Sequence, residues 1–214
     1  MSRIKTISLS GVTADDNGIV VSVTPAAGGE QALTIAGQPP QPIILDVTWA
    51  GADTGRTITF VGTDRGDNVI TEVVTGTGIG TDQTTKQFKT VTSATVDDDT
   101  AGAIIIGWAA VVYGPWYPVN ALYCDTPEYD INVVVTGTVS FDLEYTYDDL
   151  YQGSRSGLVQ GDIEPLLGVV VDADIDADTA SIRKTLTLRA QAIRLKLNSG
   201  TGSLAGHITQ AGNR

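Results

Sequence analysis

The stretch that decides the fold is residues 56–108, which reads RTITFVGTDRGDNVITEVVTGTGIGTDQTTKQFKTVTSATVDDDTAGAIIIGW. Residues 56–63 alternate polar with apolar side chains, and residues 69–75 are rich in β-branched side chains. Such side chains favour strands because they pack well on a pleated surface. Residues 64–68, DRGDN, form a cluster of turn-forming residues between the two runs. Two strand-like runs joined by a short Asp/Gly/Asn loop predict an antiparallel hairpin.

The remainder of this stretch predicts two more strands. Residues 86–96 read as a third strand, the Asp- and Gly-rich residues 97–102 as a turn, and the apolar residues 103–108 as a short fourth strand. Threonine is frequent throughout, and it suits a strand that has one face in water. The stretch therefore predicts an antiparallel meander with one solvent-facing side.

Short strand-like runs separated by turn residues continue along the rest of the chain. Two further hairpins are predicted, one joining residues 131–136 to 139–147 and the other joining residues 192–197 to 204–209. Nowhere do apolar residues keep the i, i+3, i+4, i+7 spacing of a helix for ten residues. The sequence predicts an all-β protein built of antiparallel β-sandwich or barrel modules, without substantial helix.

A change of texture near residue 113 suggests two modules in tandem. Residues 114–118 read GPWYP, an aromatic pair bracketed by prolines. A chain of 214 residues is long enough for two small β domains. We therefore expect an N-terminal β module over residues 1–112, with an extended N-terminal arm, and a C-terminal β-sandwich module over residues 113–214.

Composition excludes several classes of function. The net charge of −12 argues against nucleic-acid binding, which needs a basic face. The single cysteine, Cys124, rules out an intrachain disulfide and a multi-cysteine zinc site. No apolar run approaches the ~18 residues that span a bilayer, and the N-terminus has no secretory signal pattern. We expect a soluble protein, made in the cytoplasm, that binds neither nucleic acid nor membrane.

An acidic segment is the one candidate metal site. Residues 172–178 read DADIDAD, which places Asp172, Asp174, Asp176 and Asp178 at every second position. Carboxylate oxygens of this kind can hold Ca²⁺. The segment fails the EF-hand pattern, however, because Ala177 and Arg183 stand where glycine and glutamate are needed. A solvated acidic loop is the favoured interpretation, so the sequence predicts no cofactor and leaves Ca²⁺ as the alternative.

The sequence favours a non-enzymatic protein. His207, the only histidine, would have to serve as the base for any serine or cysteine nucleophile, and no partner for it is visible. Asp142 and Glu144 lie two apart on one predicted strand face, like the carboxylate pairs of glycosidases. Solvent or cation contact explains that pair equally well. The tripeptide Arg65-Gly66-Asp67 is explained by the hairpin turn.

Four apolar residues are candidates for an interface with another subunit or protein. Trp116 and Tyr117 form the proline-bracketed aromatic pair, and Ile4 and Ile7 lie in the N-terminal arm. Aromatic side chains are enriched in interfaces and in sugar-binding platforms. Extended segments can add a strand to the sheet of a neighbouring chain. The arm over residues 1–18 is therefore predicted to reach a neighbouring subunit.

Several blocks of the sequence resemble structural proteins of tailed-bacteriophage virions. These blocks are residues 57–64, 68–72 and 85–96, residues 118–120 and 135–149, and residues 189–203. The resemblance implies a non-enzymatic β-sandwich protein assembled on a capsid or tail, and it assigns no site residues.

From this resemblance we expect a capsid decoration or cement protein that stabilises the head through protein–protein contacts. Its partners would be the major capsid protein or other virion proteins, and its localisation the virion. A homotrimer is expected, because oligomers are usually closed and symmetric and capsids have three-fold positions. The alternatives are a tail or head–tail joining protein, a carbohydrate-binding or adhesin module that uses Trp116 and Tyr117, and a glycan hydrolase that uses Asp142 and Glu144.

Overall fold

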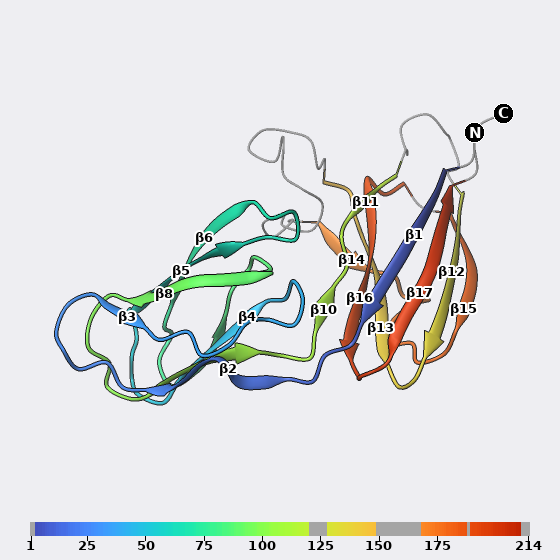
Figure 1. The fold of residues 1–214 in the computed structure, drawn as a ribbon. Coiled ribbons are helices and arrows are strands. Elements are labelled where there is room, and N and C mark those ends of the chain that lie inside the picture. The colour runs from blue at the N-terminus through green and yellow to red at the C-terminus, as the bar shows by residue number, and fades with distance from the viewer. Residues whose placement is uncertain (1–2, 120–127, 149–167, 188, 211–214) are drawn as a thin grey trace. The chain divides into compact units, whose positions relative to one another are not determined.

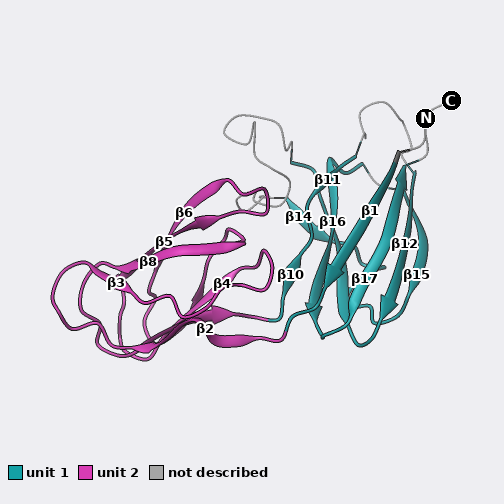
Figure 2. Cartoon of the chain, in the orientation of Figure 1, with its two compact units in different colours: residues 1–12, 110–214 teal, residues 13–109 magenta. Residues whose placement is uncertain are grey.

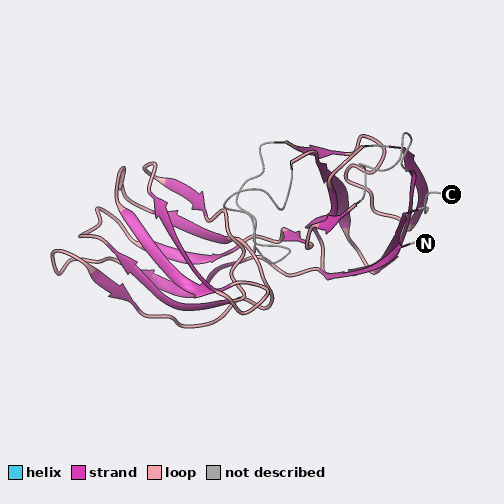
Figure 3. Ribbon diagram, turned by 90° about the horizontal axis from the view of Figure 1, so that it is seen from above, coloured by secondary structure: helices cyan, strands magenta, loops and turns pink. Residues whose placement is uncertain are grey.

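A computed structural model describes residues 3–119, 128–148, 168–187 and 189–210. Cys124 lies outside these ranges. The chain divides into two compact units (Figure 2). Residues 13–109 form one of them, the inserted unit, and residues 1–12 together with 110–214 form the other, the discontinuous unit. The described residues of both units are strands and loops without any helix (Figure 3), and all pairings are antiparallel. The all-β, antiparallel prediction is confirmed.

The inserted unit consists of two four-stranded sheets, ordered β2-β9-β4-β7 and β3-β8-β5-β6 (Figure 1). Its strands are β2 (Asp15–Val23), β3 (Gln31–Leu33), β4 (Leu45–Trp49), β5 (Thr57–Thr63), β6 (Val69–Thr75), β7 (Gly80–Gln83), β8 (Thr90–Val96) and β9 (Ile104–Trp108). Alternate residues of β4 and β5 are buried, which is the period that lines a core on one face of each sheet. The rings of Phe60 and Phe88, both fully buried, lie 6.0 Å apart in that core.

The predicted hairpin is present, but the predicted meander is wrong. β5 and β6 pair throughout, from Thr57↔Thr75 to Thr63↔Val69. β8, the third strand, pairs with β5 instead of β6, and β9, the fourth, belongs to the other sheet, beside β4. The short strand β7 also crosses to that sheet. The strands could be identified from the sequence, but their order in the sheets could not.

The discontinuous unit also has two sheets. One is ordered β1-β17-β12-β15, and the other β10-β16-β13-β14, with β11 pairing with β16 as well. The strands are β1 (Arg3–Ser10), β10 (Val112–Tyr113), β11 (Tyr117–Pro118), β12 (Glu128–Thr136), β13 (Ser140–Thr146), β14 (Val169–Val171), β15 (Ile182–Thr187), β16 (Ala192–Ser199) and β17 (Ser203–Gln210). Fully buried residues from both sheets, among them Tyr129, Ile131, Phe141 and Leu195, form the core.

Strand β1 explains why the unit is discontinuous. It pairs with β17 along its whole length, from Arg3↔Gln210 to Ser10↔Ser203. The expected boundary between residues 112 and 113 lies three residues from the observed junction after Ala109. The first twelve residues, however, belong with the C-terminal residues instead of the N-terminal module. The arm predicted to reach a neighbouring subunit is thus a strand of this chain's own sheet.

Two glycine corners replace the other two predicted hairpins, which are wrong. β12 and β13 lie in different sheets, and so do β16 and β17, so each short connection passes from one sheet to the other. Gly137 and Gly200 turn these corners with φ of 81° and 104°, a region that glycine enters without strain. The corners contact each other, because the Gly202 amide donates a 3.0 Å hydrogen bond to the Thr138 carbonyl. A side chain at Gly200 would meet that same carbonyl oxygen.

Candidate functional site

The most unusual polar feature of the discontinuous unit is a buried set of charges on β13 and β16. The strand register places Asp142 opposite Lys196 and Glu144 opposite Arg194. Asn198 lies two residues beyond Lys196 on β16, on the same face of the sheet. We call these five residues the ionic ladder. The other face of the same strands carries the buried Phe141, Leu143, Leu195 and Leu197, as period-two alternation requires.

Both carboxylates of the ionic ladder are almost completely buried. Asp142 is 4% exposed and Glu144 5%. One Glu144 oxygen, Oε2, accepts a 2.6 Å hydrogen bond from Arg194 Nε and forms an ion pair with Arg194 Nη2, also at 2.6 Å. The Lys196 Nζ lies 3.2 Å from Asp142 Oδ2 and 3.8 Å from Glu144 Oε1. Two buried acids are thus balanced by two cations, which is the arrangement that makes the burial of charge tolerable.

The second oxygen of Asp142 has its own donors. Oδ1 accepts a hydrogen bond of 2.6 Å from Asn198 Nδ2 and one of 2.8 Å from the backbone amide of Ala177. Ala177 has a left-handed φ of 53°, a conformation that costs a non-glycine residue free energy. The carboxyl group is therefore held on both oxygens, and its position is fixed from three directions.

Aromatic rings pack against the cationic part of the ladder. The Arg194 guanidinium carbon lies 4.5 Å from the ring centroid of Tyr113 and 4.3 Å from that of Trp116. These are cation–π distances, and such contacts stabilise more when the cation is withdrawn from water. Arg194 thereby fastens β10 and β11 to the sheet, in addition to their few backbone hydrogen bonds.

The predicted interface residues are placed differently from one another. Trp116 is 1% exposed, and its ring lies against Arg194, so it offers no free platform to a sugar or a partner. The half-buried Tyr117 donates a 3.3 Å hydrogen bond from its hydroxyl to the Thr6 carbonyl. Ile7 is buried in the core, whereas Ile4 is 64% exposed. Of the four, Ile4 is the residue whose side chain is open to another molecule.

The acidic segment, residues 172–178, is a loop of turns and bends that follows β14. Its backbone bonds to β13, with the amides of Asp172 and Asp178 donating to the carbonyls of Leu143 and Phe141. Ile175, fully buried, anchors the segment, and Asp174 forms a 2.8 Å ion pair with Lys184. Within the described ranges, no three His, Cys, Asp or Glu side chains converge in a way that could hold a metal ion. The four aspartates Asp172, Asp174, Asp176 and Asp178 are not brought together.

His207 lies on an exposed face of β17, where its Nδ1 is 3.3 Å from the hydroxyl of Thr6 on β1. A nucleophile–base pair also needs a group that orients the base. The described part of the chain places no further hydrogen bond on this ring. The pair therefore reads as a cross-strand contact next to an open sheet edge.

The turn predicted at residues 64–68 is confirmed. Asp64 is buried, and its Oδ1 accepts hydrogen bonds from the amides of Gly66 and Asn68 at 2.7 and 2.8 Å. Asp67, in the left-handed conformation with φ 64°, forms a 2.6 Å ion pair with Lys89. The Arg-Gly-Asp tripeptide is thus part of a tight turn whose aspartate is already engaged.

The aspartates at residues 97–99 organise a second loop of the inserted unit. Asp98 Oδ1 accepts hydrogen bonds of 2.9 Å from the amides of Gly29 and Asp99, and its Oδ2 pairs with Arg56 at 3.0 Å. The amide hydrogen bonds, helped by Arg56, lower the pKa of the Asp98 carboxyl below its ordinary value of 3.8. These interactions favour the ionised form.

We expect this carboxylate to make the inserted unit sensitive to acid. Because the folded pKa of Asp98 is below the unfolded one, its stabilisation is complete above about pH 3.8 and is lost as the pH falls through the folded pKa. The Asp98→Asn variant keeps an oxygen acceptor but has no charge to lose. Thermal unfolding followed from neutral to acidic pH should therefore show a shallower decline for the variant. Parallel curves for the two proteins would contradict this prediction.

Comparisons of the chain with models of protein families, with curated proteins and with solved structures found no match. Among the described residues there is no helix long and apolar enough to cross a membrane.

Sequence reasoning found two of the five residues of the ionic ladder. It placed Asp142 and Glu144 on one face of a strand and left contact with solvent or with a cation open. Both carboxylates are buried and contact the cationic side chains of Arg194 and Lys196. Arg194, Lys196 and Asn198 alternate with apolar residues in the same way. The signal that could have united the two strands is their charge complementarity at matching spacing, since opposite charges are favoured as cross-strand neighbours.

Proposed function

We propose that this chain is a non-enzymatic structural protein of a tailed-bacteriophage virion, and specifically a decoration protein that stabilises the head through protein–protein contacts. The proposal rests on the sequence blocks that resemble such proteins. The fold supports it, because antiparallel sandwich units present rigid surfaces and open sheet edges. No comparison identifies the family, so the test must be made on particles.

The observation that carries the proposal is an exposed apolar sheet edge. Strand β14 stands last in its sheet and pairs, within the described residues, with β13 alone. All three of its residues are valines, each 36–38% exposed. A short apolar edge strand is a template onto which an extended segment of another chain can add. We propose that β14 receives such a segment from the major capsid protein.

The test is co-sedimentation of the purified chain with heads and, separately, with tails of the phage whose genome encodes it. We expect binding to heads, at positions that cross-linking mass spectrometry would assign to the major capsid protein. Val170→Lys, which puts a charge on the edge strand, should weaken binding at least about tenfold, or 1.4 kcal/mol. Val134→Lys is the matched control, because Val134 is 49% exposed but lies on β12, an interior strand of its sheet.

Binding to tails alone would replace head decoration with the tail or head–tail alternative. A wild-type chain that sediments with neither would overturn the proposal. Light scattering gives the oligomeric state, for which we propose a trimer. A chain that is monomeric at the concentration of the binding assay would contradict the proposed trimer. It would not change the outcome of the head-binding test.

A further inference from the structure

We propose that Lys196 and Asp142 condense into an intramolecular isopeptide bond between Nζ and Cγ, with Glu144 as the proton-transfer group. The bond would join β16 to β13, the two adjacent inner strands of their sheet. This inference stands on the geometry of the ionic ladder and is independent of the proposed function.

The reacting groups are already in contact. Asp142 and Lys196 are direct cross-strand partners, and Nζ lies 3.2 Å from Oδ2. Oδ2 is bonded to Cγ, so Nζ lies beside the carbon that it would attack. Groups positioned side by side react as if at very high concentration, because the entropy of bringing them together has been lost during folding. The strand pairing on both sides of the pair holds it in place.

The carbonyl oxygen that would gain charge has two donors aimed at it. Addition of Nζ to Cγ moves an electron pair onto Oδ1. That oxygen already accepts hydrogen bonds from Asn198 Nδ2 at 2.6 Å and from the Ala177 amide at 2.8 Å. Two preorganised donors on one oxygen are the arrangement that stabilises a tetrahedral oxyanion. An ordinary ion pair on the protein surface does not require two such donors on one carboxylate oxygen.

Glu144 is placed to move the proton. Arg194 occupies Oε2 through a hydrogen bond from Nε and an ion pair with Nη2, while Oε1 lies 3.8 Å from Lys196 Nζ. A first proton passes from the Lys196 ammonium to Asp142 Oδ2, which leaves a neutral amine and a carboxylic acid. The amine adds to Cγ, and Glu144 then takes a second proton from Nζ and delivers it to Oδ2. The Cγ–Oδ2 bond breaks, and Oδ1 returns to a carbonyl.

Across these reaction steps, one ammonium and one carboxylate are converted to one amide and one water molecule. Glu144 is regenerated as a carboxylate beside Arg194. No oxidant or other reagent is needed. Burial favours the product, because Asp142 is 4% exposed and the Lys196 side chain 21%. Two ions lose much of their hydration there, whereas the amide carries no charge and its water departs.

The decisive experiment is the intact mass of the folded, full-length chain. We expect the wild type to be lighter, by the mass of one water molecule, than its sequence requires, and Lys196→Arg to have its full mass. Digestion and tandem mass spectrometry should recover one branched peptide that contains residues 142 and 196. Glu144→Gln should leave the strands uncrosslinked while its circular dichroism spectrum stays that of a folded β protein.

The wild type contains a matched control. Lys184 and Asp174 form a shorter ion pair, 2.8 Å, but they are more exposed. Among the described residues, no two donors converge on one oxygen of Asp174. They should remain uncondensed in the same digest. A wild-type chain of full mass after prolonged incubation at neutral pH would overturn the proposal whatever the variants do. So would a link from Lys196 to Asn198, which would release ammonia instead of water.

Discussion

Replacing Arg194 with alanine is expected to destabilise the discontinuous unit by about 3–5 kcal/mol, the usual cost of removing one partner of a buried ion pair. Glu144, 5% exposed, would keep its charge without its two contacts to the guanidinium group. The stacking on Tyr113 and Trp116 would also be lost. Urea unfolding monitored by tryptophan fluorescence measures the change, which should appear in one unfolding transition and leave that of the inserted unit in place.

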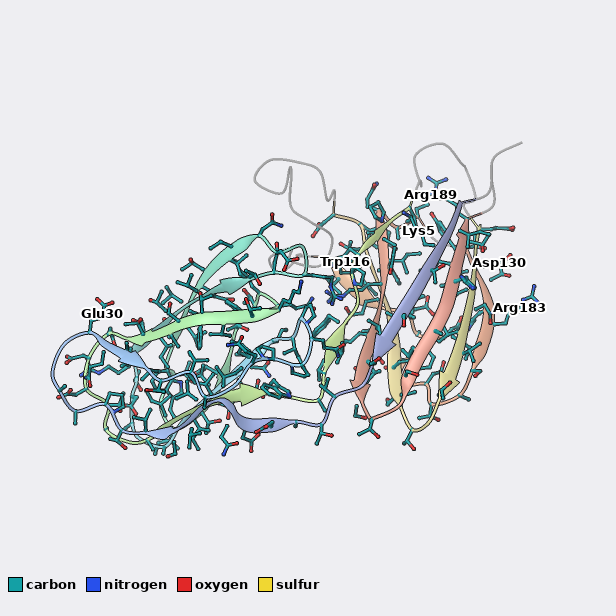
Figure 4. The ribbon with its side chains drawn as sticks, viewed as in Figure 1. Lys5, Glu30, Trp116, Asp130, Arg183 and Arg189 are labelled. Atoms are coloured by element: carbon teal, nitrogen blue, oxygen red, sulfur yellow. The ribbon has the colours of Figure 1, made fainter. Side chains whose placement is uncertain are left out.

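Two control variants test whether the loss of stability in Arg194→Ala comes from the buried ion pair. Arg183→Ala removes an arginine that points away from β15 into solvent (Figure 4), and it should change the free energy of unfolding by less than about 0.5 kcal/mol. The double variant Glu144→Gln, Arg194→Met removes both charges. In a Lys196→Arg background, which cannot form the cross-link, it should lose less stability than Arg194→Ala does in the same background, since a buried pair is often replaceable as a pair. Equal losses for Arg183→Ala and Arg194→Ala would show that the ionic ladder contributes little.

Replacing Phe60 with alanine should destabilise the inserted unit by about 3–5 kcal/mol, the range for large-to-small changes at buried aromatic positions. Phe60 is fully buried on β5, and its ring contacts Phe88. Its removal leaves a cavity that the neighbouring strands cannot close without breaking their register. Differential scanning calorimetry should show the transition of the inserted unit at a lower temperature.

The control for Phe60 lies on the next strand. Val69 begins β6 and is 76% exposed, so Val69→Ala should stay within about 0.5 kcal/mol of the wild type. A Phe60→Ala variant that unfolds like the wild type would mean that this core is not what holds the two sheets together.

The local sequence pattern was enough to predict the class of fold and most strands. Runs of β-branched residues favour strands and turn residues end them, and both signals lie within a few neighbouring positions. Pairing was predicted only where a loop closes a hairpin within one sheet, as between β5 and β6. At Gly137 and Gly200 the same signals, a short glycine-containing connection between alternating strands, mark a passage between sheets. Local sequence does not distinguish the two, because both need a tight turn and both keep the alternation.

The ionic ladder was hidden for a related reason. A strand with one apolar and one polar face usually has its polar face in water, so Asp142 and Glu144 read as solvated. Their burial depends on β16, Trp116 and the acidic segment, which come from elsewhere in the chain. The pairing of β1 with β17 is likewise a contact between residues far apart in sequence, for which a single sequence contains no local signal.

That terminal pairing has a consequence for how the polypeptide matures. During synthesis β1 has no partner until β17 emerges, and the whole inserted unit is translated between the two strands. The inserted unit, whose entry and exit lie together where the Trp108 indole donates a 3.1 Å hydrogen bond to the Thr13 carbonyl, can fold on the ribosome in the meantime. A nascent chain arrested before residue 203 would thus contain a folded inserted unit and an unpaired β1. Chaperones that capture exposed edges would find their target during this interval.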